Sequence, residues 1–198
     1  MRTTLTTLTL LLLGVLSAVA QNESMETPAS NEKTYELTAM VGGGYSRDVS
    51  SFEDSRNDLS LNRNQFSLFG RVMWRPGNLL SGGLEFGYMN FYSVSNNNGG
   101  KAVRNAIPLF LLFSMSPFDG LDVTVGYGFA FMGATVEGNA GSVSSSTSST
   151  ALMAALSYRY PVTDKLQIGG EARFSNFDHL DDRTISISAV VSYLITSY

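Results

Sequence analysis

The chain has 198 residues, of which 15% are charged, with a net charge of −4 and no cysteine. The absence of cysteine excludes a disulfide framework and a thiolate metal site, and a single histidine, His179, excludes a multi-histidine metal site. Thirteen basic residues against 17 acidic ones leave no basic surface for nucleic acid, so we expect no nucleic-acid partner, no metal and no cofactor.

The first 20 residues have the pattern of a secretory signal peptide. Arg2 supplies a positive charge, Leu8 to Val15 form an apolar core, and the small residues Ser17-Ala18-Val19-Ala20 precede a cleavage point at Gln21. A retained N-terminal anchor is the alternative, although the apolar run is shorter than the ~20 residues that a spanning helix needs. Residues 21–33 carry almost no apolar side chain, so we expect a flexible lead-in.

Residues 34–198 alternate with a period of two. Large apolar side chains at odd positions from Tyr35 to Tyr45 alternate with small or polar ones, and the pattern recurs in 121–132, 165–175 and 185–196. Less regular segments of the same kind occupy 65–75, 80–92, 103–115 and 150–160. Because successive side chains of a strand point to opposite faces, these segments predict eight strands, each with one apolar face and one face of small or polar residues.

The connections between these segments alternate in length. Short connections rich in turn residues lie at 75–79, 116–120 and 161–164. Longer polar segments lie at 46–64, 93–102, 136–149 and 175–183. We therefore predict an antiparallel meander with its short turns at one end and four long loops at the other.

Two architectures are compatible with this pattern. A soluble β-sandwich or lipocalin-like barrel has a polar outer face, whereas here the polar phase is crowded with Gly, Ala and Ser and the other phase carries large aliphatic and aromatic side chains. The strands are about ten residues long, which suits a tilted strand that crosses a bilayer, and only a closed barrel satisfies every backbone group in lipid. The sequence predicts an all-β fold, an eight-stranded antiparallel up-and-down transmembrane β-barrel.

The residues also carry a family resemblance. The signal peptide, the opening Met40 to Tyr45, the segment Gly169 to Phe174 and a final strand that ends in Tyr198 resemble the OmpA/OmpX-like small outer-membrane β-barrel family over residues 34–198. The resemblance implies a porin-like protein of the Gram-negative cell envelope, a multi-pass barrel in the cell outer membrane with both termini and the lead-in in the periplasm. It also implies a final aromatic residue that the barrel assembly machinery reads. Tyr198 fits that role, provided that a bulge near the end restores its outward phase.

Aromatic residues gather near both ends of the predicted strands. One set, near the periplasmic interface, comprises Tyr35, Trp74, Tyr158, Tyr160 and Tyr193; the other, near the outer interface, comprises Tyr45, Phe66, Tyr92, Phe131 and Phe174. Two aromatic girdles are expected where amphipathic rings meet lipid headgroups. Ordinary core aromatics are the alternative interpretation.

Four charged residues fall in the inward phase, away from the strand ends: Arg71, Glu85, Glu171 and Arg173. A three-residue loop at 77–79 sets Arg71 directly opposite Glu85. Because an unpaired charge in such an interior is costly, we predict an interior network of ion pairs that fills the barrel. A charged constriction in a narrow pore and a carboxylate pair of a hydrolase are the alternatives, and we predict no catalytic, cofactor or metal residue.

The last polar segment contains the single histidine. Lipid A deacylases place a serine two residues after their histidine, but Ser175 precedes His179 by four residues and no serine follows at that spacing. Acidic residues at Asp178, Asp181 and Asp182, with others in 46–64, predict a solvated acidic rim or, alternatively, a site for divalent cations that bridge lipopolysaccharide phosphates. His179 is interpreted as an exposed loop residue.

Three function classes follow. The first is a non-enzymatic, monomeric outer-membrane barrel whose extracellular loops mediate surface contact or envelope integrity, with outer-membrane lipid, lipopolysaccharide and the assembly machinery as partners. The second is a narrow channel or a carrier for small molecules. The third is a lipid A-modifying enzyme. The filled interior and the long polar loops favour the first class.

Overall fold

A computed structural model describes residues 35–49, 59–76, 79–96, 100–138, 141–178 and 182–198. The chain divides into two units, Met1–Lys33 and Thr34–Tyr198, and the second is the one described below. The signal peptide and the lead-in lie outside the described residues and remain predictions. No helix in the described part of the chain is long and apolar enough to cross a membrane.

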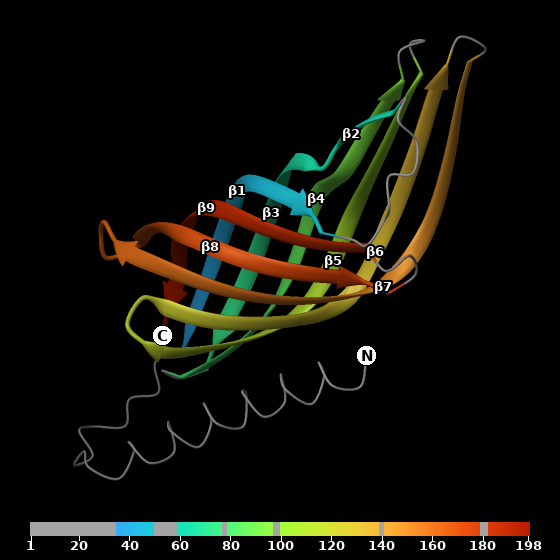
Figure 1. The fold of residues 1–198 in the computed structure, drawn as a ribbon. Helices are drawn as coiled ribbons and strands as arrows, with labels where there is room; N and C mark the ends of the chain where they lie inside the picture. The colour runs from blue at the N-terminus through green and yellow to red at the C-terminus, as the bar shows by residue number, and fades with distance from the viewer. Residues whose placement is uncertain (1–34, 50–58, 77–78, 97–99, 139–140, 179–181) are drawn as a thin grey trace, which may run out of the picture. The chain divides into compact units, whose positions relative to one another are not determined.

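Thr34–Tyr198 forms one antiparallel sheet that closes on itself (Figure 1). The strands are β1 (Glu36–Asp48), β2 (Leu59–Asn62), β3 (Asn64–Arg75), β4 (Leu80–Asn96), β5 (Lys101–Phe118), β6 (Leu121–Gly138), β7 (Gly141–Pro161), β8 (Leu166–Phe177) and β9 (Asp182–Ser197). Each strand from β3 onward pairs with the next, and β1 closes the ring between β9 and β3.

The short strand β2 continues β3 rather than adding a ninth member to the ring. Both pair with β4, and only Arg63 separates them. The pairing of Leu59 with Asn96 is offset by one residue from the pairing of Arg71 with Glu85, so the interruption is a local register shift. The predicted fold class, an eight-stranded antiparallel up-and-down barrel, is confirmed.

Inward and outward phases follow the predicted alternation. On β6, Asp122, Thr124 and Gly128 are buried while Tyr127 and Phe129 are exposed. Small inward residues are required by close approach of the chains, because a Cβ added at Gly128 would lie 1.9 Å from the carbonyl oxygen of Leu109. The outer wall therefore carries most of the large aliphatic and aromatic side chains, and the lumen holds the glycines, the polar and charged residues and a smaller set of buried apolar ones.

Three segments expected as long loops are mostly strand. β4 extends to Asn96 and β5 begins at Lys101; β6 ends at Gly138 and β7 begins at Gly141; β8 ends at Phe177 and β9 begins at Asp182. The prediction of loops at 93–102, 136–149 and 175–183 is wrong for most of their length, and residues 50–58 of the remaining one lie outside the described residues. Figure 1 shows the β4–β5 and β6–β7 hairpins reaching beyond the rest of the ring.

Residues 142–149, a serine-rich part of β7, show why these strands were not predicted. Their backbone pairs continuously with β6, from Glu137 opposite Ser142 to Ala130 opposite Ser149. Their side chains are exposed on both faces over most of the stretch. A hairpin with two exposed faces needs no apolar phase, so the period-two signal that marks a half-buried strand is absent.

The first residues of β1 meet the last residues of β9 at one end of the barrel, which we call the terminal end. The opposite end is the hairpin end. Tyr35 and Tyr198 exchange two backbone hydrogen bonds of 2.7 and 3.0 Å. The register between β1 and β9 shifts after Leu37, leaving Ile195 as an extra residue. The bulge places Tyr198 opposite Tyr35 on the outward phase, as the sequence required.

The aromatic residues largely occupy the outer surface at both ends. The Tyr35 ring stacks on Trp74 with centroids 6.3 Å apart and on Tyr198 at 5.7 Å. Exposed aromatic residues near the terminal end include Trp74, Tyr158, Tyr160 and Tyr193, and those near the hairpin end include Tyr45, Phe66, Phe131 and Phe174. Tyr92 is the exception: a bulge at Phe91 shifts the β4–β5 register and turns Tyr92 inward, onto the interior apolar residues.

Candidate functional site

Four side chains meet in the lumen: Arg71 from β3, Glu85 from β4, and Glu171 and Arg173 from β8. We call them the charged layer. Arg71 donates to Oε2 of Glu85 at 2.9 and 2.7 Å and to Oε1 of Glu171 at 3.2 Å. Arg173 donates to both oxygens of Glu85 at 2.7 and 3.0 Å and to Glu171 at 2.7 Å. Each arginine therefore binds both glutamates.

The charged layer is buried and electrically neutral. At most 5% of each of the four side chains is exposed. The Phe69 ring lies under both guanidinium groups, 4.2 Å from Arg173 and 5.1 Å from Arg71 between ring centroid and Cζ. Opposite charges at hydrogen-bond distance offset part of the cost of removing each from water. A planar guanidinium that faces carboxylates and stacks on a ring uses the features in which Arg differs from Lys.

Strand phase and register bring the four residues together. Arg71 lies directly opposite Glu85 in the β3–β4 ladder. Glu171 and Arg173 are two residues apart on β8 and so share the inward face. The closed ring brings the inward faces of β4 and β8 close enough for Glu85 and Arg173 to bond across the lumen. The structure thus assembles all four residues singled out from the sequence.

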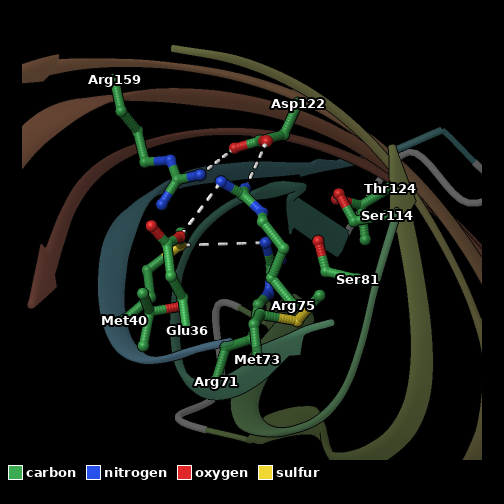
Figure 2. Close-up of a pocket in the computed structure, with 11 residues that line it drawn as sticks. Glu36, Met40, Arg71, Met73, Arg75, Ser81, Ser114, Asp122, Thr124 and Arg159 are labelled. Atoms are coloured by element: carbon green, nitrogen blue, oxygen red, sulfur yellow. Dashed lines mark hydrogen bonds and ion pairs between the residues drawn. The ribbon is translucent and has the colours of Figure 1, made fainter. Parts of the chain in front are cut away.

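A second cluster, which sequence reasoning missed, lies at the terminal end of the lumen: Glu36, Arg75, Asp122 and Arg159 (Figure 2). Asp122 accepts a hydrogen bond from Arg159 and lies 3.5 Å from Nη2 of Arg75, which also donates to Ser116 Oγ at 3.0 Å. Arg75 also lies 3.5 Å from Glu36. These residues were overlooked because they are close to strand ends, although Asp122 and Arg159 both fall in the inward phase.

A cavity of about 20 Å³ lies between this terminal-end cluster and the charged layer (Figure 2). Arg71, Arg75 and Arg159 are among the residues that line it. A volume of this size accommodates about one water molecule. This cavity is too small for a continuous file of water molecules between the two polar regions.

An apolar cluster fills much of the interior, mainly on the hairpin side of the charged layer. Met89, Phe91, Met132 and Phe177 belong to one buried cluster, which we call the apolar cluster; its other members are Met73, Ala106, Phe110, Leu112, Ala130, Ala151, Met153 and Ala155. Phe91 and Phe177 meet edge to face with centroids 5.0 Å apart. They lie six residues beyond Glu85 and Glu171 on the same strands, so aromatic rings fill part of the lumen on that side of the charged layer.

The acidic residues of the hairpin end are not all solvated. Asp182 is buried and pairs with Arg104 at 2.8 Å, and Asp48 is buried on the inward face of β1. The prediction of a solvated acidic rim is wrong for these two, because β1 and β9 extend further than expected and carry both positions into the ring. His179 and Asp181 lie outside the described residues. Ser175 is fully buried in the lumen, and no group of acidic, cysteine or histidine residues in the described ranges could hold a metal.

A closed eight-stranded ring with a lipid-facing apolar wall and a filled polar interior is the architecture of a small outer-membrane barrel. The family model for the outer membrane protein beta-barrel domain matches residues 8–193. The chain belongs to this family. Its location in the outer membrane follows from the family and the fold together.

Two solved structures show the same fold. Ail, the attachment invasion locus protein of Yersinia pestis, aligns with a TM-score of 0.59 at 13% identity over 83% of this chain and 99% of that one. Neisserial surface protein A aligns with a TM-score of 0.55 at 14% identity over 82% of this chain and 99% of that one. No curated protein matches the sequence. At this identity the likeness establishes the fold of this family member alone.

Proposed function

We propose that this outer-membrane barrel is a closed, non-enzymatic protein that presents its hairpins at the cell surface for contact or envelope integrity. The single observation that carries the proposal is the charged layer. Its two arginines and two glutamates neutralise one another across the lumen, so they leave no net charge to attract a permeating ion. The apolar cluster lies beside it and would exclude water.

Conductance of the refolded protein in a planar bilayer tests this proposal. We expect no steady conductance steps, since an ion would have to separate several short charge-assisted hydrogen bonds to pass. Steady steps in the nanosiemens range would favour the second class, a narrow channel. A variant with Arg71→Ala and Glu85→Ala serves as a positive control for opening, because it removes half of the charged layer and leaves it neutral.

The hairpins carry the proposed surface contact. The outer part of β7 is rich in serine and threonine, exposed, and held by an unbroken ladder to β6. Such a surface offers hydroxyl groups on a firm scaffold. Ail, one of the structural neighbours, is the attachment invasion locus protein of its organism. We extend surface contact to this chain on the geometry of the hairpin.

Shortening the hairpin in register tests this role. Deleting residues 134–137 together with 142–145 removes four opposed pairs and keeps both the phase and the tip. We expect the barrel to fold unchanged, as seen in its gel mobility before and after heating, and adhesion of expressing cells to matrix-coated surfaces to fall. Unchanged adhesion would leave envelope integrity as the role.

The proposed orientation has both termini in the periplasm and the hairpins outside. The short connections at the terminal end and the extended hairpins at the other end match the asymmetry of bacterial barrels. Labelling of Lys101→Cys with a membrane-impermeant thiol reagent in intact cells tests it, since the chain has no other cysteine. We propose a monomer, lipopolysaccharide as lipid partner and the assembly machinery as the reader of Tyr198. Release of acyl chains from lipid A that depends on His179 would instead establish an enzyme.

A further inference from the structure

One side of β7 lies open where the β6–β7 hairpin extends past the ring. The ladder between β7 and β8 ends at the pair of Ala151 with Phe177. Beyond that pair, up to Gly141, β7 pairs with β6 alone among the described strands. Residues 141–148 are all exposed, and Figure 1 shows this hairpin reaching past the end of β8. We call the side of residues 142–148 that faces away from β6 the open edge.

The direction of the peptide groups at the open edge follows from the ladder. The carbonyl oxygen of Thr150 accepts a hydrogen bond from the amide of Asp178, so the peptide groups of Thr150 point away from β6. Along a strand, the peptide groups of every second residue point to the same side. Each residue on that side offers one donor and one acceptor to a further strand. The residues whose peptide groups line the open edge are Ser142, Ser144, Ser146 and Ser148.

The sequence leaves this edge unprotected. Natural proteins usually guard an exposed sheet edge with charged side chains, with proline or by keeping the edge strand short. No charged residue and no proline lies between Glu137 and Arg159. The other edge of the extended sheet differs, because β2 has four residues and Arg63 follows it directly. A long edge without such protection is a template for pairing with another strand.

The open edge is complementary to itself. Two copies can meet antiparallel about a two-fold axis that passes at Ser145, and every residue of the edge then faces a residue with which it exchanges backbone hydrogen bonds. In this register the facing pairs are Ser142 with Ser148, Ser144 with Ser146, and Val143 with Thr147. The last pair is β-branched, which strands favour, and the others are small hydroxyl residues. No like charges meet, although the whole chain carries a net charge of −4.

We propose that the open edge pairs with the open edge of a second copy in a facing membrane. Antiparallel pairing requires the two β7 strands to run in opposite directions. Copies in one membrane have β7 running the same way, whereas copies in two facing membranes have it running in opposite ways. The occupant is therefore a second copy from a neighbouring cell, and each copy remains a monomer in its own membrane. The inference rests on the surface contact proposed above and names its partner.

Disulfide cross-linking between two vesicle populations tests the pairing, since the chain has no cysteine. Ser145→Cys is refolded with either of two tags, each in its own vesicles, and the mixed vesicles are oxidised. Facing residues that share no hydrogen bond lie about 4.5 Å apart between Cα atoms, which suits a disulfide. We expect dimers that carry both tags. Ser148→Cys, which faces Ser142 instead of itself, is the matched control and should give about tenfold fewer such dimers, because its two cysteines lie too far apart.

A second measurement separates the backbone from the side chains. Ser146→Pro removes one amide hydrogen of the open edge and spares the β6 ladder, because proline is tolerated where the N–H of an edge strand faces solvent. We expect wild-type vesicles to cluster in light scattering, Ser146→Pro to abolish the clustering and Ser146→Ala to retain it. Gel mobility before and after heating checks that each variant folds, and thiol labelling of Lys101→Cys checks that hairpins face outward from the vesicles.

Four results would overturn the pairing. Equal yields from Ser145→Cys and Ser148→Cys would show random collision, and dimers of one tag alone would show pairing within one membrane. Clustering by Ser146→Pro equal to that of the wild type would show that the edge is not used. Inhibition by an unrelated strand-forming peptide, as strong as that by a peptide of residues 141–149, would show that the edge accepts any extended chain. The vesicles contain no matrix, so these results are independent of the cell adhesion that tests the proposed function.

Discussion

The charged layer and the apolar cluster fill the same lumen by different physical means. In the charged layer, each side chain has directed bonds to two partners, so its geometry depends on the register of β3, β4 and β8. In the apolar cluster, Phe91, Phe110 and Phe177 fill volume by contact without directed bonds. The difference teaches that one region specifies how the strands align, whereas the other excludes water and tolerates more change in shape.

Breaking the charged layer should have the largest effect. Arg173→Ala leaves Glu85 and Glu171 facing Arg71 alone, with a net negative charge in the interior. We expect a loss of about 3–5 kcal/mol in the free energy of unfolding, measured by urea titration in lipid vesicles. Arg173→Lys keeps the charge but not the planar donors, so its loss should be smaller. Equal losses for the two variants would show that charge is irrelevant to this region.

A charge introduced on the outer wall would have no partner there, unlike the charges of the charged layer. Ala189 is exposed on β9 and pairs with Gly43 and Gly170 in mid-strand. Ala189→Arg should cost about 2–4 kcal/mol near the bilayer midplane. Val162→Arg, in the turn after β7, is the control and should cost about 0–1 kcal/mol. A cost at Ala189 no larger than at Val162 would contradict the assignment of the outward phase to lipid.

The apolar cluster should respond less than the charged layer to a change of shape. Met153→Leu keeps an apolar side chain of similar volume at a buried site of the cluster. We expect a loss below about 1.5 kcal/mol, measured by the same unfolding titration. A loss as large as that of Arg173→Ala would mean that the packing of the apolar cluster also fixes the register.

The exposed hairpin should respond least. Ser146 lies opposite Gly133 on the extended β6–β7 ladder and is exposed. Ser146→Lys should change the free energy of unfolding by no more than about 0.5 kcal/mol. A larger change would show that this part of the hairpin packs against another part of the protein.

The fold and the charged layer could be predicted from the sequence because both depend on side chains that alternate with a period of two. Arg71, Glu85, Glu171 and Arg173 share the inward phase of strands whose outward phase is plainly apolar. The alternation did not predict which face the residues near strand ends occupy. Tyr92 lies after a bulge that reverses the phase, and Asp182 lies in a strand that looked like a loop. Bulges and strands exposed on both faces leave no periodic signal in the sequence. Only the three-dimensional structure places these residues.

The end of β1 shows the same limit. The residues of the charged layer could be predicted because they stand among small residues in the inward phase. Arg47 could not be placed, because β1 was expected to end at Tyr45 and Arg47 was assigned to a loop. Only the register with Ile185 places Arg47 on the outer wall.

The central claim is that the charged layer acts as one self-neutral unit that closes the lumen. The most direct test is a double-mutant cycle on Arg71 and Glu85, with the free energy of unfolding measured in vesicles for the two single variants and the double variant. The account predicts that Glu85→Ala alone destabilises the barrel more than Glu85→Ala with Arg71→Ala, because the double variant keeps the neutral pair of Glu171 and Arg173. Additive losses from the two single variants would contradict it.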